Sequence, residues 1–390
     1  MLRLLVVLLT AFNITVVDPG HFHASLVQKF PLEGVSDTVF VYAPKGPELD
    51  SYLAAVEEFN TRSENPTHWV EQVYAGDDFL EKLPQGGDFV VLAGNNAHKT
   101  DYILEAVRKG YNVLSDKPLA IDSDGYRKLR KAYSIAQKKG LVILDLMTER
   151  YDTLNIAARQ IIADPQMFGT PVSASLESIH HFCKMVSGKP TRRPQWYYDV
   201  TQQGEGIADV TTHLIDILFW QCFPGCALKP SDVKNLTASH YPTVITPEQF
   251  EMSTGAVVDA PFEVNSNGEM SFRIKGMDVK LAVRWDFVAP AGGGDTYQAV
   301  IVGTRGTVRF VQDATTGYVR ELFYRPAGGE EEQIIIPSGE RLGHEDHFNK
   351  VATSFLDYIC RRREVPRWEV PNTITKYYIT TTAVREANRR

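Results

Sequence analysis

The chain has 390 residues, of which 43% are hydrophobic and 23% are charged. This is the composition of a folded globular protein and excludes a disordered or fibrous chain, while the length indicates two domains. The formal net charge is −7 and Lys and Arg are scattered, so the chain lacks a basic stripe that would attract nucleic acid or an anionic membrane. A small-molecule substrate is expected.

The four cysteines are too few for a disulfide framework in a chain of this length. They are Cys183, Cys222, Cys226 and Cys360. We expect structural thiols at all four positions, with a Cys222–Cys226 bridge as the alternative in an oxidising compartment.

An apolar run opens the chain at residues 1–12, where one Arg is followed by leucines and valines. This run is too short to span a bilayer, and no other segment is long enough, so no transmembrane span is expected. It fits either the front of a core strand or an export leader. Because residues 13–17 already make a complete first strand, the sequence favours an export leader, and with it an exported location over a cytoplasmic one.

Residues 13–147 alternate between short apolar runs and helical patterns. The apolar runs are residues 14–17, 39–42, 89–93, 113–114 and 141–144, and the helical patterns include residues 100–109 and 125–139. This alternation predicts a doubly wound parallel sheet, a Rossmann-like dinucleotide-binding domain whose ligands lie at the carboxyl ends of the strands.

The turn after the first strand should hold a phosphate, and here it reads Asp18-Pro19-Gly20-His21-Phe22-His23. Only Gly20 remains of a G-x-G-x-x-G pattern, so an ordinary turn is an equal interpretation. His21 and His23 suggest a metal, but no third ligand is evident in the sequence, and we predict no metal site.

The second strand should end in a carboxylate that binds a ribose. Instead it ends in Tyr42-Ala43-Pro44-Lys45. The choice between NAD and NADP is therefore open, with Lys45 as a candidate partner for a 2′-phosphate.

The segment at residues 204–216 predicts a helix with two glycines at its entry, because apolar residues recur there and just beyond with helical spacing. On that helix Asp209 and His213 lie one turn apart. Such a pair can tune each other's basicity for acid/base chemistry, although a surface pair is the more common case.

A Lys also follows the predicted fifth strand. The fourth strand is followed by Gly94-Asn95-Asn96, and Asp116-Lys117-Pro118 comes twenty residues after Asn96. At the end of a strand beside a ligand cleft, the Lys117 ammonium can bind a substrate hydroxyl and stabilise developing negative charge, while the following Pro fixes the backbone.

Together these motifs resemble the Gfo/Idh/MocA family of nicotinamide-dependent sugar and polyol dehydrogenases. Asn96 matches the Asn of the family's loop after the fourth strand, residues 116–118 match its Glu-Lys-Pro, and residues 204–216 match most of its Gly-Gly-x-x-x-Asp-x-x-x-His-x-x-Asp. Two departures are Asp116 in place of Glu, and Lys99 where the family often has His.

The resemblance implies NAD or NADP as cofactor and a catalytic set of Lys117, Asp209 and His213. The cofactor contacts it implies are Gly20, His21, Phe22, Gly94, Asn95, Asn96, Asp116, Lys117 and Pro118.

From about residue 148 the pattern changes to longer amphipathic strands. We expect an α+β substrate domain at residues 148–342, with a large, mostly antiparallel open sheet of strands between residues 270 and 336. Arg150 lies at the crossover between domains. Trp196 and Tyr197 lie in an aromatic loop suited to the apolar face of a sugar ring, so these three residues are the candidate substrate contacts.

The last segment, residues 343–390, is predicted to be helical and to pack back on the body. His344 and His347 are interpreted as part of a helix start rather than as metal ligands. This segment, with the Asp-Pro-Gly-His-Phe-His turn, resembles a subgroup of bacterial oxidoreductases with a distinctive C-terminal region, and the family's broad sheet implies a homo-oligomer.

The expected activity is transfer of a hydride from a sugar or glycoside hydroxyl carbon to NAD(P). One alternative is an NAD-dependent glycosidase or lyase that oxidises the sugar transiently and recycles a tightly bound cofactor. Another is a sugar or nucleotide sensor without catalysis.

Overall fold

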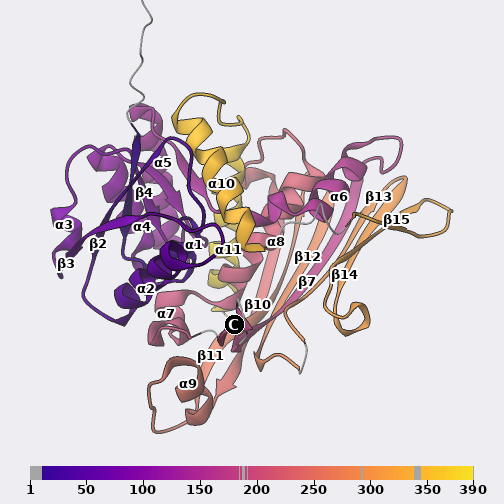
Figure 1. Ribbon diagram of the computed structural model, residues 1–390. Helices are drawn as coiled ribbons and strands as arrows, with labels where there is room; N and C mark the ends of the chain where they lie inside the picture. Colours follow the sequence, from indigo (N-terminus) through magenta and orange to yellow (C-terminus); the bar gives the residue numbers. More distant parts are fainter. Residues whose placement is uncertain are drawn as a thin grey trace, which may run out of the picture.

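The computed structural model describes residues 11–183, 185–186, 189–190, 192–290, 293–337 and 344–389. The predicted export leader at residues 1–12 lies outside this range except for its last two residues, and the first strand begins at Phe12. Figure 1 shows an N-terminal sheet wrapped by helices beside a long C-terminal sheet, with the last two helices between them. Among the described residues, none of the helices combines the length and apolar character needed to cross a membrane.

The N-terminal sheet has six parallel strands in the order β3-β2-β1-β4-β5-β6, which confirms the predicted doubly wound fold. Its strands are β1 (Phe12–Val17), β2 (Val35–Ala43), β3 (Val70–Ala75), β4 (Phe89–Leu92), β5 (Asn112–Ser115) and β6 (Ile143–Asp145). Its helices are α1 (His23–Leu26), α2 (Pro47–Thr61), α3 (Phe79–Lys82), α4 (Asn96–Lys109) and α5 (Ser123–Lys139). Strand order reverses between β1 and β4, which is where such sheets bind ligands.

The C-terminal sheet has eight strands in the order β10-β11-β12-β7-β13-β14-β15-β16, and only the β7–β12 pair is parallel. Its strands are β7 (Pro171–Cys183), β10 (Val233–Ile245), β11 (Phe262–Ile274), β12 (Met277–Val288), β13 (Thr296–Gly303), β14 (Gly306–Gln312), β15 (Glu321–Pro326) and β16 (Glu332–Ile334). A small ribbon pairs β8 (Met185–Val186) with β9 (Lys189–Pro190). The expected large, mostly antiparallel sheet is confirmed, but the sequence interpretation did not identify β10.

Helices cover one face of this sheet. They include α6 (Thr153–Ala163), α8 (Gly206–Cys222) and α11 (Glu369–Ala387), while α7 (Val200–Gln203) and α9 (Pro247–Thr254) lie at its edge. The core between helices and sheet includes Ile207 and Leu218 of α8 together with Leu281 of β12. Along β12 buried and exposed residues alternate, so the opposite face of the sheet is open.

The start of α8 explains the two glycines in its motif. Gly204 adopts a φ of +92°, in the left-handed region that favours glycine. At Gly206 a Cβ would lie 1.7 Å from the carbonyl oxygen of Ser266 on β11, so only glycine lets the helix start this close to the sheet. The helix axis, and with it Asp209 and His213, is thereby fixed against the sheet.

The last segment joins both domains. Helix α10 (His344–Ile359) places Phe348 and Phe355 in the core of the N-terminal sheet, where Phe355 meets Phe89 with ring centroids 5.5 Å apart. Helix α11 packs on α8 and α5, and its Tyr377 donates a hydrogen bond to Asp145 of β6. These helices hold the two sheets in one arrangement.

Candidate active site

A cavity of about 1270 Å³ opens between the two domains. One wall is formed by His21 and His23 of the loop after β1 and by Lys117, which follows β5. Another wall is α8, with Asp209 and His213, and the strands β7, β12 and β13 face them. The cavity therefore lies at the carboxyl ends of the N-terminal strands, where the fold places ligands.

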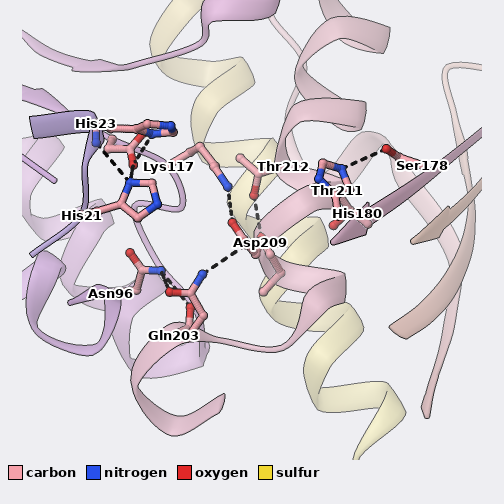
Figure 2. Close-up of polar contacts among 12 residues, drawn as sticks. His21, His23, Asn96, Lys117, Ser178, His180, Gln203, Asp209, Thr211 and Thr212 are labelled. Atoms are coloured by element: carbon pink, nitrogen blue, oxygen red, sulfur yellow. Dashed lines mark hydrogen bonds and ion pairs between the residues drawn. The ribbon is translucent and has the colours of Figure 1, made fainter. Parts of the chain in front are cut away.

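Lys117 and Asp209 meet across the domain boundary. The Lys117 ammonium donates to one carboxylate oxygen of Asp209, and Gln203 Nε2 donates to the other at 3.1 Å (Figure 2). The side chain of Asp209 is only 5% exposed and that of Lys117 is 14% exposed. The predicted Lys and Asp are thus brought together, with Lys117 closer to the open cavity.

The charge of Asp209 is set by its surroundings. Burial alone would raise the pKa of this carboxyl group, but the Lys117 ammonium, its hydrogen bond and the nearby His213 hold the pKa below its ordinary value of 3.8. Asp209 is therefore a carboxylate at neutral pH, suited to orienting a cation. His213 lies one turn later on α8 and lines the same cavity.

A chain of hydrogen bonds links this pair to α4. Asn96 donates through Nδ2 to the backbone oxygen of Gln203 at 2.8 Å and to its Oε1 at 3.1 Å, and it accepts from the buried Lys99 ammonium at 2.5 Å. Asn95 likewise donates to Gln202 Oε1 at 2.8 Å. The amide protons of Asn96 are thus used to bridge the domains, and its contact with a cofactor stays a prediction.

The turn after β1 is unusual for a phosphate-binding loop. Asp18 has a φ of +48° in a position where glycine is usual, and Asp is one of the residues that tolerate this conformation. The amides of Gly20 and His21 are already bonded to the carbonyls of Asp18 and Ala93. A Cβ on Gly20 would lie 3.3 Å from Trp196, so this tryptophan packs on the turn. Trp196 is not among the residues that line the cavity.

The glycine at position 94 is explained by close packing of the backbone. A Cβ at this position would lie 2.0 Å from the carbonyl oxygen of Asp18, so glycine is needed for the two strand-end loops to pack together. Phe22 lines the cavity beside His21, whereas Pro118 follows Lys117 outside the cavity lining.

His21 and His23 share an acidic neighbour that the sequence interpretation missed. Asp116 Oδ2 lies 3.0 Å from His23 Nδ1 and 3.6 Å from His21 Nδ1. The prediction of no metal rested on the lack of a third ligand, and that premise is wrong, because β1 and β5 both end beside β4 and bring Asp116 to the histidines.

The wall contributed by β7 and β12 combines polar and aromatic groups. His180 Nε2 lies 2.9 Å from Ser178 Oγ (Figure 2). His180 Nδ1 lies 3.2 Å from Asp295 Oδ2. Trp285 lies beside His180, with ring centroids 5.2 Å apart, and Tyr197 also lines the cavity. Of the two aromatic residues predicted to bind substrate, Tyr197 is at the cavity.

Arg150 does not reach the cavity lining. Its guanidinium donates to both oxygens of Asp216 at 2.7 Å and to Glu369 at 2.8–2.9 Å, inside a buried ionic cluster that also contains Lys376. This arrangement does not fit the predicted substrate contact and assigns Arg150 to holding the domains together.

The start of α10 forms part of the cavity wall through Glu345, Asp346 and His347. Glu345 forms an ion pair with Lys29, whose Nζ lies 2.6 Å from Glu345 Oε2. The sequence interpretation placed these residues in a helix start only. Nothing in their local pattern could have placed them opposite α8, because that depends on how the tail folds back.

The four cysteines are free thiols, as expected. Burial raises the pKa of the Cys222 thiol well above its ordinary value, which suits a structural role.

Comparison with known families identifies the class of the chain. Residues 159–334 and 327–388 match the family described as "Putative oxidoreductase C terminal domain", which spans more than half of the sequence. A solved structure described as a "putative oxidoreductase" from Parabacteroides merdae ATCC 43184 is 37% identical, with 97% of this chain and 98% of that chain covered and a TM-score of 0.94. The chain belongs to this family of oxidoreductases.

More distant structures share the fold. Levoglucosan dehydrogenase in complex with NADH and levoglucosan is 16% identical, with 97% of this chain and 98% of that chain covered and a TM-score of 0.68. Biliverdin reductase from Synechocystis sp. PCC 6803, in complex with biliverdin and NADP+, is 14% identical, with 96% and 99% covered and a TM-score of 0.67. The predicted resemblance to Gfo/Idh/MocA oxidoreductases is confirmed. No curated protein matched the chain.

Proposed function

We propose that the protein transfers a hydride between a nicotinamide cofactor and a carbon that bears a hydroxyl group in a sugar or glycoside. The observation that carries this proposal is the ion pair between Lys117 and Asp209 at the wall of the interdomain cavity. It sets a cation, held by a buried carboxylate, beside a histidine and an open space large enough for a sugar.

In this proposal Lys117 hydrogen-bonds the substrate oxygen and stabilises the negative charge that grows on it as the hydride leaves. His213 accepts the hydroxyl proton, and the carbon becomes a carbonyl. Asp209 positions Lys117 rather than exchanging protons, because its pKa is held low. The cofactor supplies the hydride-accepting ring.

The carboxyl edge of the N-terminal sheet fits a dinucleotide in part. Gly20 and Gly94 lie at the carboxyl ends of β1 and β4, at the point of strand reversal, but the space beside their α-carbons is filled by Trp196 and by the Asp18 carbonyl. The turn offers fewer free amides than a G-x-G-x-x-G loop, since those of Gly20 and His21 are bonded within the protein. Lys45 is exposed just beyond β2 and is the proposed partner of a 2′-phosphate if NADP is used.

The opposite wall supports a sugar as substrate. Tyr197 and Trp285 offer aromatic surfaces, while His180, with Ser178 and Asp295, offers hydrogen-bonding groups on the same side of the cavity. Apolar ring faces combined with a few placed polar groups are what sugar binding requires. The NADH and levoglucosan complexes of levoglucosan dehydrogenase are consistent with this assignment.

The test is an assay of the purified full-length protein with NAD or NADP and a panel of free sugars and glycosides. We expect substrate-dependent formation of reduced nicotinamide with at least one sugar. Release of the aglycone without net cofactor reduction would instead identify the glycosidase alternative. Saturable sugar binding with neither product would identify a sensor, and either result would overturn the proposed reaction.

A further inference from the structure

His21, His23 and Asp116 form a compact group that the proposed proton handling does not use. The two histidines follow β1 and the aspartate follows β5, so three strand-end residues far apart in sequence converge on one point. One potential ligand atom from each residue lies within 4.8 Å of the other two. Figure 2 shows His21 and His23 close together, to the left of Lys117.

Two of the three distances between the ligand atoms are close to those of a coordination sphere, and the third is no more than 4.8 Å. Metal bonds of about 2.0–2.2 Å to imidazole nitrogen and carboxylate oxygen place the ligand atoms of a tetrahedral site roughly 3.3–3.5 Å apart. Asp116 Oδ2 lies 3.0 Å from His23 Nδ1 and 3.6 Å from His21 Nδ1, so these contacts bracket that distance. Small side-chain movements would suffice to admit an ion.

The surroundings fix the three groups from outside. The Lys99 ammonium donates to the backbone carbonyl of Asp116 at 3.0 Å and so holds the end of β5. The His23 ring packs against Phe348 with centroids 4.8 Å apart, and edge-on against the His21 ring at 4.2 Å. These backbone and packing contacts restrict the movement of the three groups.

One side of the group remains accessible. His21 and His23 both line the interdomain cavity, together with Lys117. Three protein ligands leave a coordination position for water or a substrate oxygen, which is the pattern of a catalytic rather than a structural zinc site.

We propose that His21, His23 and Asp116 bind a divalent transition metal whose open position faces the interdomain cavity. Two imidazoles and one carboxylate are ligands suited to zinc, iron(II) or manganese rather than to calcium. An ion at this place would polarise a substrate oxygen on the same side of the cavity as Lys117. This site does not depend on hydride transfer, and it can be tested without cofactor or substrate.

The test is calorimetric titration of the chelator-treated full-length protein with Zn²⁺, with the bound metal counted by elemental analysis. We expect one tight site per chain. The double variant H21A/H23A should weaken binding by about 100-fold or more, since even residues behind the ligands change affinity by 10–100-fold. D116N should weaken it in the same direction.

The matched control is H98A, which removes an exposed histidine of α4. It should bind zinc as the wild type does. Circular dichroism and thermal melting of each variant show that it is folded, and the visible spectrum of bound Co²⁺ reports imidazole coordination directly. Equal zinc affinity in wild type and H21A/H23A, or no tight site in the wild type, would overturn the proposal and leave His23–Asp116 as a hydrogen-bonded pair.

Discussion

Asp209 and Asp216 lie about two turns apart on α8, and each is buried against basic groups from other parts of the chain. Asp209 meets Lys117 at the wall of the cavity. Asp216 meets Arg150 and Lys376 in a cluster that is not part of the cavity lining and that Glu369 and Asp145 complete. Both aspartates belong to one sequence motif, but only one faces space that a substrate can enter.

This difference shows that a buried ion pair between domains does not by itself indicate a catalytic site. In the closed cluster three carboxylates share two basic side chains and pair only within the cluster, which links α8, α11 and the crossover after β6. The ionic partner of Asp209 is Lys117, which also lines the cavity. There the same type of contact can position a cation beside a substrate. Variants of the two clusters should therefore separate activity from stability.

The largest expected effect is on turnover in K117M. Loss of the cation that stabilises the substrate oxygen should lower kcat by about 10³–10⁴-fold, as when a key electrostatic group is removed. Steady-state assays measure the loss, and a fluorescence titration with NADH should show cofactor binding retained. K128M removes an ammonium that pairs with Asp101 on the surface and should keep wild-type turnover. Near-normal activity in K117M would refute the catalytic assignment.

The next effect is on stability, in R150M. Removing the guanidinium leaves two buried carboxylates short of a partner and should lower the free energy of unfolding by about 3–5 kcal/mol. Denaturant titration measures this, and turnover per folded molecule should be unchanged. R127M is the control, because Arg127 is an exposed partner of Asp124 and should contribute less than about 1 kcal/mol. A selective loss of substrate affinity in R150M would restore the substrate role expected from the sequence.

A smaller effect is expected in D209N, where the carboxylate that holds Lys117 loses its charge. We expect kcat to fall by about 10²-fold with little change in KM, because the cation is misplaced rather than absent. D209E keeps the charge and should recover part of the activity. If D209N and D209E were equally impaired, the role of Asp209 would be packing.

The smallest effect concerns pH and separates wild type from D216N. Burial opposes ionisation of Asp216, but Arg150 and Lys376 hold its pKa well below its usual range. Because the folded pKa lies below the unfolded value, this stabilisation is present above about pH 4 and is lost as the pH falls below that. The difference in unfolding free energy between the two proteins should therefore shrink on acidification from pH 5 to pH 3. A difference in unfolding free energy that does not change with pH would show that the charge of Asp216 does not stabilise the folded protein.

The sequence predicted the parallel sheet, the antiparallel sheet and α8 because their apolar periodicities are local. It also predicted that Lys117 and Asp209 belong together, through the motif order of a known family. It could not predict Gln203 as a neighbour of Asp209, or Asp116 as a neighbour of His21 and His23, because these contacts depend on how α7 packs and on the order of strands in the sheet. The hydrogen-bond partners of Arg150 and Asn96 could not be predicted for the same reason, since they lie far along the chain.

The position of helix α10 has a consequence for how the protein folds during synthesis. Its residues Phe348 and Phe355 fill the core of the sheet that residues 12–145 build, more than 200 residues earlier in the chain. Domains commonly fold in the order in which they leave the ribosome. Here the sheet that is synthesised first keeps an open apolar face until Phe348 and Phe355 have been translated, so its core is completed only after the strands of the C-terminal sheet have been synthesised.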